Sequence, residues 1–334
     1  MRTVSPEQYA ETAAAIEREI GKVVVGQQAL VRDVLVCLLC EGHGLLEGVP
    51  GLGKTVLLKT LSSAVDLEFN RVQFTPDLMP ADIVGTQVLE TLPDGGRDFR
   101  FRPGPVFASL VLADEVNRAT PKTQSALLEA MQERMVTVAG ATRPLPRPFL
   151  VMATQNPLEM EGTYPLPEAQ LDRFLLKALV PFPSAEELVA VVGRTTGGAE
   201  ATVSAVADAE QIRAMIALTR EVPVPSHLVE HAVDLVVATH PDQDAAPELV
   251  RRYVRFGASP RGAQALILAA KATALLDGRP SVAAEDIRAV APAALRHRLV
   301  VGYGAVADAV AADQIVAAVL DEVPAPKVGL RGAP

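Results

Sequence analysis

The spacing of apolar residues divides this 334-residue chain into two parts with different predicted structures. Up to about residue 183, short apolar runs alternate with helix-like stretches, and this alternation predicts an α/β fold with a parallel sheet. From residue 184 onwards, apolar residues recur at every third or fourth position, which predicts helices only. The expected strands of the first part cover residues 43–47, 67–73, 110–113, 149–154 and 175–180, and its expected helices cover 5–20, 29–41, 56–64 and 122–133.

The second part is expected to be a separate α-helical domain over residues 184–323, after a first domain over residues 1–183. Ser184 and Glu187 have the spacing of a capping box and mark the change. A stretch rich in glycine and alanine at 197–207 is expected to be a mobile linker, and the tail 324–334 to be disordered. The helices of this part are expected at 208–219, 226–239, 260–276, 283–295 and 304–320.

Two insertions interrupt the alternation of strands and helices in the first part. Between residues 74 and 107, Phe99 and Phe101 alternate with charged residues after a turn at 93–96, which predicts a β-hairpin. A second hairpin-like insertion, rich in proline and arginine, is expected at 136–148. The alternation of strands and helices does not require either insertion, so each needs a separate explanation.

Composition and charge limit the classes of protein to which the chain can belong. A net charge of −9 argues against a general nucleic-acid binder, which usually carries a basic face. The N-terminus lacks the apolar segment of a secretory signal, and the densest apolar run, 34–40, is too short to span a bilayer. A cytoplasmic protein with no membrane span is therefore expected. Cys37 and Cys40 lie inside that run and are interpreted as core residues, because no further zinc ligands are close in sequence.

The stretch between the first expected strand and the helix that follows it carries the clearest chemistry. It fits Gly-x-x-x-x-Gly-Lys-[Ser/Thr], the pattern of loops that bind nucleotide phosphates. Its glycines let backbone N–H groups turn towards phosphate oxygens, and Lys54 opens a helix whose N-terminus favours anions. Thr55 offers a hydroxyl to Mg²⁺. The predicted nucleotide-binding residues are Gly48, Val49, Pro50, Gly51, Leu52, Gly53, Lys54, Thr55 and Asp114.

Polar residues at the ends of two later strands complete the expected site. Asp114 and Glu115 follow the apolar run 110–113, so Asp114 can hold Mg²⁺ opposite Thr55 and Glu115 can deprotonate a water molecule. The strand 149–154 delivers Asn156 to the same edge of the sheet, where its amide can bind the attacking water or the γ-phosphate. These residues favour an enzyme that hydrolyses ATP with Mg²⁺.

With these motifs in this order, the sequence resembles the MoxR-type AAA+ ATPases over nearly its whole length, from about residue 25 to residue 301. The resemblance implies a P-loop domain with a parallel sheet between helices, followed by a helical lid. It also implies assembly into a ring of identical chains, usually a hexamer. The matching stretches are residues 48–55, 112–119, 122–133, 153–157, 165–174 and 257–262.

The same resemblance implies roles for single residues and for the insertions. Asn156 takes the place of the sensor 1 residue, and Arg173 that of the arginine finger, which completes the active site of the neighbouring subunit. Arg261 has the sensor 2 position and would contact the nucleotide from the lid. The two hairpins match the helix 2 insert and the pre-sensor 1 hairpin, which point towards the ring pore or face a client. Family resemblance further suggests a partner protein with a von Willebrand factor A domain.

The function expected first is an ATP hydrolase that remodels, matures or activates a protein partner. A nucleotide-gated assembly adaptor with little hydrolysis is one alternative, and a metal-insertion ATPase resembling the magnesium chelatase ring subunit is another. A rival motif, His227-Leu-Val-Glu-His231, fits the pattern of inverted zinc proteases. Ser226 is a predicted helix N-cap, which would leave this pair in a fraying first turn, so we do not expect a zinc site there.

Overall fold

The structure, a computed structural model, describes residues 3–91, 93, 96–156, 162–197 and 201–326. The chain forms two compact units, Met1–Ala217 and Leu218–Pro334. This division lies later than the expected boundary after residue 183, because the helix that follows Ser184 packs on the N-terminal segment: Arg194 Nη1 donates to the carbonyls of Gly21 and Lys22, both at 3.0 Å. The expected bounds of the two domains, 1–183 and 184–323, stay a prediction, and most of the tail predicted to be disordered, 327–334, lies outside the described residues.

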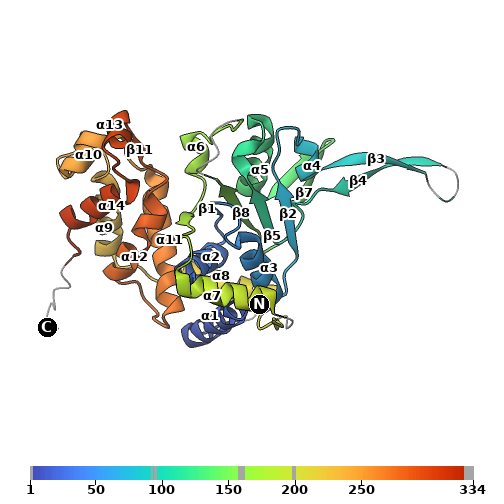
Figure 1. Ribbon diagram of the computed structural model, residues 1–334, viewed down its shortest axis with the longest axis horizontal. Helices are drawn as coiled ribbons and strands as arrows, with labels where there is room; N and C mark the ends of the chain where they lie inside the picture. The colour runs from blue at the N-terminus through green and yellow to red at the C-terminus, as the bar shows by residue number, and fades with distance from the viewer. Residues whose placement is uncertain (1–2, 92, 94–95, 157–161, 198–200, 327–334) are drawn as a thin grey trace. The chain divides into compact units, whose positions relative to one another are not determined.

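Five strands of the first unit form one parallel sheet (Figure 1), as the alternating pattern predicts. Its order is β2-β5-β8-β1-β9, so β5, β8 and β1 lie next to one another in the middle. Because all neighbouring strands run in parallel, their carboxyl ends meet at one edge of the sheet. The strands are β1 (Gly44–Glu47), β2 (Phe69–Gln73), β5 (Leu110–Asp114), β8 (Leu150–Gln155) and β9 (Leu176–Leu179).

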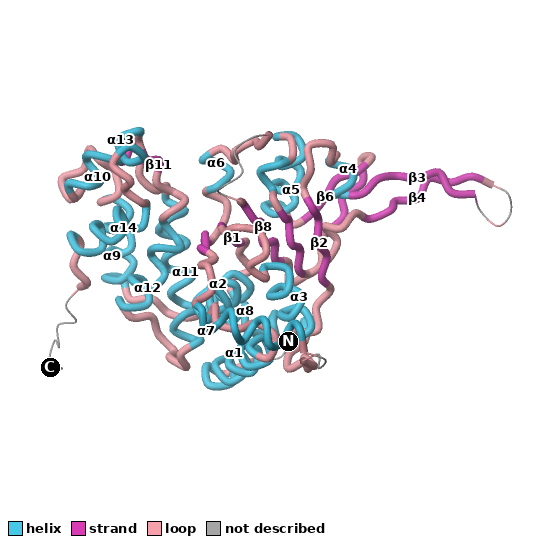
Figure 2. Tube along the Cα trace, viewed as in Figure 1, coloured by secondary structure: helices cyan, strands magenta, loops and turns pink. Residues whose placement is uncertain are grey.

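Helices cover both faces of this sheet (Figure 2), and alternate strand residues serve the two layers. On one face, Val111 and Val151 pack with Leu127 and Met131 of α5 (Pro121–Glu133) in the main core. The α3 helix contacts β2 and β5, α2 contacts β9, and α1 packs on both of these helices. The bounds of this second layer are α1 (Pro6–Gly21), α2 (Gln28–Leu39) and α3 (Lys54–Ala64).

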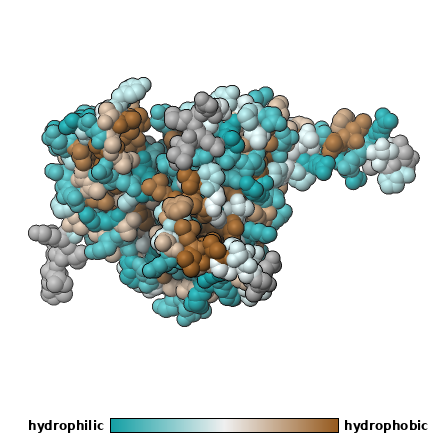
Figure 3. Space-filling view, viewed as in Figure 1, coloured by the Kyte–Doolittle hydropathy of each residue, from teal (hydrophilic) through white to brown (hydrophobic). Residues whose placement is uncertain are grey.

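Both insertions form antiparallel hairpins, as predicted, and the longer one extends away from the sheet (Figure 1). Leu89 and Phe99 lie opposite each other on it and are 51% and 63% exposed, which gives the apolar patch seen on this extension in Figure 3. The Arg143 guanidinium of the shorter hairpin lies 3.9 Å from the centre of the Phe101 ring in the longer one. The hairpins are β3 (Gly85–Thr91) with β4 (Arg97–Pro103), and β6 (Met135–Val138) with β7 (Ala141–Pro144); α4 (Pro80–Val84) precedes β3.

The expected mobile linker at 197–207 is a wrong prediction for the part that the structure describes. Backbone N–H groups of Val206 and Ala207 donate to the Ala64 carbonyl at the end of α3, at 2.8 and 3.3 Å. The N–H of Ser204 donates to Glu19 of α1 at 2.9 Å. These bonds fix the segment on the α1–α3 layer. The remaining helices of this region are α6 (Glu168–Leu171), α7 (Ala185–Thr196) and α8 (Ala209–Glu221).

The second unit is mostly helical, but the sequence predictions for it are wrong in two places. Two short strands, β10 (Val254–Phe256) and β11 (Val300–Val301), pair in antiparallel. The single helix expected at 304–320 is two helices, separated by residues 308–311. No helix within the described ranges is long and apolar enough to cross a membrane. The helices are α9 (Ser226–Val237), α10 (Glu248–Tyr253), α11 (Pro260–Leu276), α12 (Ala284–Leu295), α13 (Tyr303–Ala307) and α14 (Ala312–Glu322).

Candidate functional site

The glycine-rich loop joins the carboxyl end of β1 to the first residue of α3. Gly51 and Gly53 have φ angles of +85° and +77°, a conformation that side chains disfavour. Gly48 is required by packing instead, since a Cβ at this position would lie 2.7 Å from the Cβ of Val180. Because α3 begins at Lys54, its unpaired N–H groups and positive dipole end face the loop. The loop therefore has the backbone of an anion-binding site.

Lys54 is held inside this loop. Its side chain is buried, and Nζ donates to the carbonyl of Gly48 at 2.6 Å. Burial lowers the pKa of Lys54, while the nearby carboxylates of Asp114 and Glu115 oppose this shift. A buried ammonium gains from an additional anionic partner, and a phosphate group would supply one.

Asp114 and Glu115 lie where β5 ends, beside the end of β8. Thr154 Oγ1 donates to Asp114 Oδ1 at 2.6 Å and accepts from the Glu115 N–H at 2.8 Å. Glu115 has a φ of +56°, an uncommon conformation for a residue with a side chain. Thr154 thus fixes the turn that places both carboxylates at the carboxyl edge of the sheet.

Side chains from β2 and from the short helix η1 (Val116–Arg118) hold the same two carboxylates. Arg71 donates through Nε and Nη2 to Asp114 Oδ2, at 3.1 and 2.7 Å. Gln73 Nε2 and Arg118 Nη1 both donate to Glu115 Oε2, at 2.7 and 2.9 Å. Both acidic groups therefore accept hydrogen bonds from side chains of this chain.

These groups line one cavity of about 350 Å³, here called the nucleotide cavity. It brings together the predicted residues Lys54, Thr55, Asp114, Glu115 and Asn156. A hydroxyl and a carboxylate oxygen are ligands that suit Mg²⁺, and a cation already lies at Asp114 in the form of Arg71, so Thr55 and Asp114 fit the predicted metal. Within the described residues, no three His, Cys, Asp or Glu side chains form a separate metal cluster. The cavity is lined by Pro50, Gly51, Leu52, Gly53, Lys54, Thr55, Val56, Arg71, Asp114, Glu115, Thr154 and Asn156.

Neither of the two predicted arginines is among the residues that line the nucleotide cavity. Arg173 follows α6 and donates through Nη1 to the Leu128 carbonyl of α5 at 3.3 Å. It lines a different depression of about 280 Å³, here called the Arg173 surface. Arg261 lies in the second unit, in the first turn of α11, where its N–H donates to Ser259 Oγ at 3.1 Å. The Arg173 surface consists of Ser125, Leu128, Glu129, Gln132, Glu133, Gln170 and Arg173.

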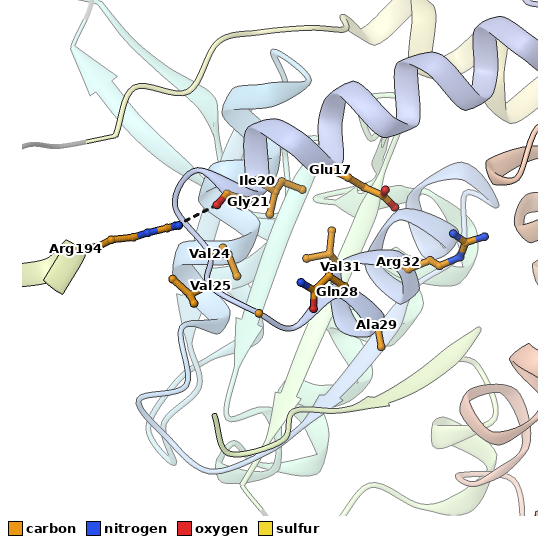
Figure 4. Close-up of a pocket in the computed structure, with 11 residues that line it drawn as sticks. Glu17, Ile20, Gly21, Val24, Val25, Gln28, Ala29, Val31, Arg32 and Arg194 are labelled. Atoms are coloured by element: carbon orange, nitrogen blue, oxygen red, sulfur yellow. Dashed lines mark hydrogen bonds between the residues drawn. The ribbon is translucent and has the colours of Figure 1, made fainter. Parts of the chain in front are cut away.

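A further cavity of about 430 Å³ was not predicted from the sequence (Figure 4). It lies among α1, α2 and the segment between them, and Arg194 of α7 reaches its rim. Gln27 Nε2 donates to the carbonyl of Leu52 at 3.3 Å, so this segment touches the phosphate loop itself. We call it the N-terminal cavity; Val24, Val25, Val31 and Ala29 give it an apolar wall.

Sequence reasoning missed Arg71, Gln73 and Thr154 among the residues of the site. The signal for Arg71 and Gln73 is their alternation with Val72, which is buried in the core. Period-2 spacing puts the two polar residues on the opposite side of β2, and Gln73 is in register with Asp114. Thr154 ends the apolar run that leads to Asn156, and its hydroxyl is the one polar group of that run.

The rival motifs do not form sites. His227 is exposed and His231 is buried, so the two imidazoles do not share an exposed metal-binding face. The helix there begins at Ser226 itself, with Pro225 as its N-cap. Cys37 and Cys40 are buried thiols within the α2 region, and burial raises the pKa of Cys37. A raised pKa disfavours the reactive thiolate, in keeping with a core role.

The chain is similar to known proteins over most of its length. Its residues 43–176 match the ATPase family associated with various cellular activities (AAA), and residues 246–319 match the AAA lid domain. "Chaperone MoxR1" of Mycobacterium tuberculosis is 44% identical over 310 residues, 93% of this chain and 81% of the relative. "Protein MoxR" of Methylorubrum extorquens is 33% identical over 307 residues, 87% of this chain and 88% of the relative. A crystal structure of an ATPase candidate from Cytophaga hutchinsonii has a TM-score of 0.90 and 40% identity, and the match covers 96% of this chain and 97% of that one.

Proposed function

We propose that this chain, which belongs to the MoxR-type AAA+ ATPase family, couples ATP binding and hydrolysis to the remodelling, maturation or activation of a protein partner. The observation that carries this proposal is the nucleotide cavity. A phosphate loop, a buried lysine, two carboxylates and an amide line it together. This is the set of groups that phosphoryl transfer to water requires.

The loop and Lys54 would bind the triphosphate. Residues 51–55 line the cavity, so their backbone N–H groups would donate to phosphate oxygens, and the dipole of α3 favours the negative charge of a phosphate. Lys54 would exchange its bond to the Gly48 carbonyl for a bond to the β- and γ-phosphates. The base of the nucleotide is proposed to lie in the N-terminal cavity, whose apolar wall suits a flat ring.

Thr55 and Asp114 would hold Mg²⁺ next to the phosphates. Bound Mg²⁺ supplies a Lewis acid that draws negative charge from the phosphate oxygens. Glu115 accepts a proton from the attacking water, which needs its Oε2 to leave Gln73 and Arg118. Asn156 is buried beside them and would orient the water or the γ-phosphate by a hydrogen bond without adding charge.

Arg173 is proposed to act as an arginine finger on the nucleotide of a neighbouring copy. Support comes from its position, since it lines the Arg173 surface rather than the cavity that holds Lys54 and Glu115. A guanidinium neutralises charge on the transferring phosphoryl group, so hydrolysis would depend on assembly into a ring, proposed to be a hexamer. Arg261 would contact the nucleotide as the sensor 2 residue of the lid.

The partner is proposed to be a protein with a von Willebrand factor A domain, as the family resemblance suggests. The β3–β4 hairpin supports a role in contacts, because Leu89 and Phe99 expose apolar side chains far from the sheet. The cytoplasmic location stays a prediction. Capture of partners on ATP-loaded Glu115→Gln protein, with Lys54→Ala protein as the control that binds no nucleotide, would identify a client that depends on the ATP state.

The experiment that tests the proposed hydrolysis is a steady-state assay of Glu115→Gln. Loss of the base should lower the turnover number by at least about 100-fold, while a fluorescent ATP analogue still binds with similar affinity. Glu210→Gln serves as the matched control, because Glu210 is exposed on α8 and outside the nucleotide cavity. Unchanged turnover in Glu115→Gln would remove Glu115 from the mechanism.

The nucleotide-gated adaptor is the second candidate, and one observation favours it. Both carboxylates are engaged by this chain, Asp114 by Arg71 and Glu115 by Gln73 and Arg118. If these bonds persist with ATP bound, hydrolysis is slow and ATP acts as an assembly signal. ATP-dependent ring formation with no measurable turnover, with and without a partner, would favour the adaptor over the hydrolase. The metal-insertion ATPase stays an alternative with the same architecture.

A further inference from the structure

Strand β2 presents Arg71 to the nucleotide cavity from the edge of the sheet, and Gln73 lies two residues further along the same strand. Val72 is buried in the core, whereas Arg71 and Gln73, one residue to either side, are exposed on the opposite face. β2 is one of the two edge strands of this five-stranded sheet, and it pairs with β5 so that Gln73 is in register with Asp114. The side chain of Arg71 therefore extends from the strand that pairs with β5, and its guanidinium contacts the carboxylate of Asp114 at the end of β5.

Both oxygens of Asp114 already have partners. Oδ2 accepts from Nε and Nη2 of Arg71, at 3.1 and 2.7 Å, and Oδ1 accepts from Thr154 Oγ1 at 2.6 Å. Gln73 Oε1 accepts from the same Arg71 Nη2 at 2.7 Å and so holds the guanidinium on the carboxylate. The Asp114 side chain is 14% exposed, which reduces the screening of this ion pair by water.

We propose that Arg71 is a positioning residue that competes with a divalent cation for Asp114, so that the metal enters with a nucleotide rather than before it. The inference rests on the proposed function, because it takes Asp114 as the metal ligand. Mg²⁺ needs its oxygen ligands at about 2.0–2.1 Å, and a guanidinium on the same oxygen repels it. Arg71 lines the nucleotide cavity, so a bound triphosphate offers it a new anionic partner when it leaves Asp114.

This arrangement has a consequence for the order of binding. Without nucleotide, a metal that binds Asp114 leaves the guanidinium of Arg71 with Gln73 Oε1 alone, and this loss weakens metal binding. With nucleotide, the phosphates take Arg71 and provide further oxygen ligands for the metal. Arg71 thereby weakens metal binding to the nucleotide-free protein and makes the affinity for the divalent cation depend on the bound triphosphate.

The test is Mn²⁺ binding to nucleotide-free protein, measured from the EPR signal of unbound Mn²⁺, and it requires no hydrolysis. Arg71→Gln should bind one Mn²⁺ per chain roughly tenfold more tightly than the unsubstituted protein, because the competing cation is gone. Arg71→Met keeps the stem of the side chain and should give the same gain. Arg71→Lys keeps a cation near Asp114 and should retain most of the suppression.

Arg100→Gln is the matched control for net charge, since Arg100 lies on the β3–β4 hairpin and pairs with Glu90. Its Mn²⁺ affinity should stay within about twofold of the unsubstituted protein. Equal gains in Arg100→Gln and Arg71→Gln, or no gain in Arg71→Gln and Arg71→Met, would overturn the competition by Arg71. If the tight site persists in Arg71→Gln combined with Asp114→Asn, Asp114 is not the ligand, and the metal assignment of the proposed function fails with it.

Discussion

Two depressions of the first unit, the nucleotide cavity and the Arg173 surface, differ in what they lack. The nucleotide cavity has a phosphate loop, Lys54, Asp114 and Glu115, but Arg173 lies outside it. The Arg173 surface has that arginine beside the carboxylates of Glu129 and Glu133, and the phosphate loop is not part of it. Under the proposed function each would hold a part of a phosphoryl-transfer site, which is the arrangement expected when two copies of a chain share one site.

The two depressions also differ in construction. The nucleotide cavity lies at the ends of β1, β5 and β8, and backbone groups form much of it, so its geometry is fixed by the sheet. The Arg173 surface is formed by residues of α5, by Gln170 of α6 and by Arg173. The guanidinium of Arg173 donates to the backbone carbonyl of Leu128 at 3.3 Å. A preformed cradle and an adjustable arginine suit a site that closes only when a neighbour docks.

Removal of the Arg173 guanidinium should have the largest effect on the rate of ATP hydrolysis. Arg173→Ala should bind ATP normally but hydrolyse it about 1,000-fold more slowly, because no guanidinium stabilises the transition state at any interface of the ring. Glu115→Gln should be similarly inactive for a different reason. Mixing the two inactive variants should restore activity, since some interfaces then pair the Glu115 of one chain with the Arg173 of the other. Turnover at several mixing ratios measures this.

Lys59→Ala is a suitable control for the mixing experiment, because Lys59 is exposed on α3 and lies outside both depressions. Lys59→Ala should hydrolyse ATP at the normal rate alone. When the same substitution is added to the two inactive variants, their mixture should recover as much hydrolysis as before. If mixtures of Arg173→Ala and Glu115→Gln stay inactive while both variants still form mixed assemblies, the two depressions do not share a site.

The sequence indicates which residues meet in the nucleotide cavity, because most of them are contiguous in the chain. Eight consecutive residues form the loop, and Asp114 and Glu115 directly follow an apolar run, so strand ends alone place them. The side chains that hold these carboxylates could not be predicted in the same way. Arg71 and Asp114 meet only because β2 and β5 pair in one particular register, and spacing along the chain does not contain that register.

Short secondary-structure elements and coil segments that pack on helices could not be predicted from the sequence either. β11 has two residues, fewer than any alternation can reveal, and the break between α13 and α14 lies in a stretch with continuous helix formers. The segment 201–207 has the composition of a linker, but several of its backbone N–H groups donate hydrogen bonds to residues of α1 and α3. Hydrogen bonds to distant parts of the chain decide such cases, and composition does not record them.

His43 links the sheet, which carries the nucleotide cavity, to α5, which carries most of the Arg173 surface. Its titration tests how much this link contributes to the stability of the first unit. Its Nδ1 accepts from the Val151 N–H on β8, so Nε2 carries the proton and donates to the Met131 carbonyl of α5, both at 3.0 Å. Burial lowers the pKa of His43 to about 4. The unfolded chain, with an ordinary pKa near 6.5, then binds the proton more readily than the folded one.

The contribution of His43 to stability is therefore complete above pH ~6.5 and is lost as the pH falls from ~6.5 towards ~4. Between pH 7 and pH 5 this single group should lower the free energy of unfolding by roughly 2 kcal/mol. Denaturant unfolding of the first unit at a series of pH values, compared with His43→Gln, isolates the effect from the carboxylates. A variant with the same slope as the unsubstituted protein between these pH values would show that His43 does not titrate there.

A substitution in the N-terminal cavity should have the smallest effect on ATP binding and hydrolysis. It also separates nucleotide binding in one chain from the supply of Arg173 to the other. Ala29 is exposed on the first turn of α2 and lines this cavity, so Ala29→Trp fills it from its surface without changing the core. If the base of ATP lies there, Ala29→Trp should weaken ATP binding about fivefold to tenfold, and Ala29→Ser should not. The Arg173 surface is untouched in this variant. Ala29→Trp should therefore still restore hydrolysis when mixed with Arg173→Ala, because its Arg173 can complete the intact cavity of the other chain. Loss of that rescue would mean that nucleotide binding and the supply of Arg173 are not separable, and the two depressions would have to be treated as one site.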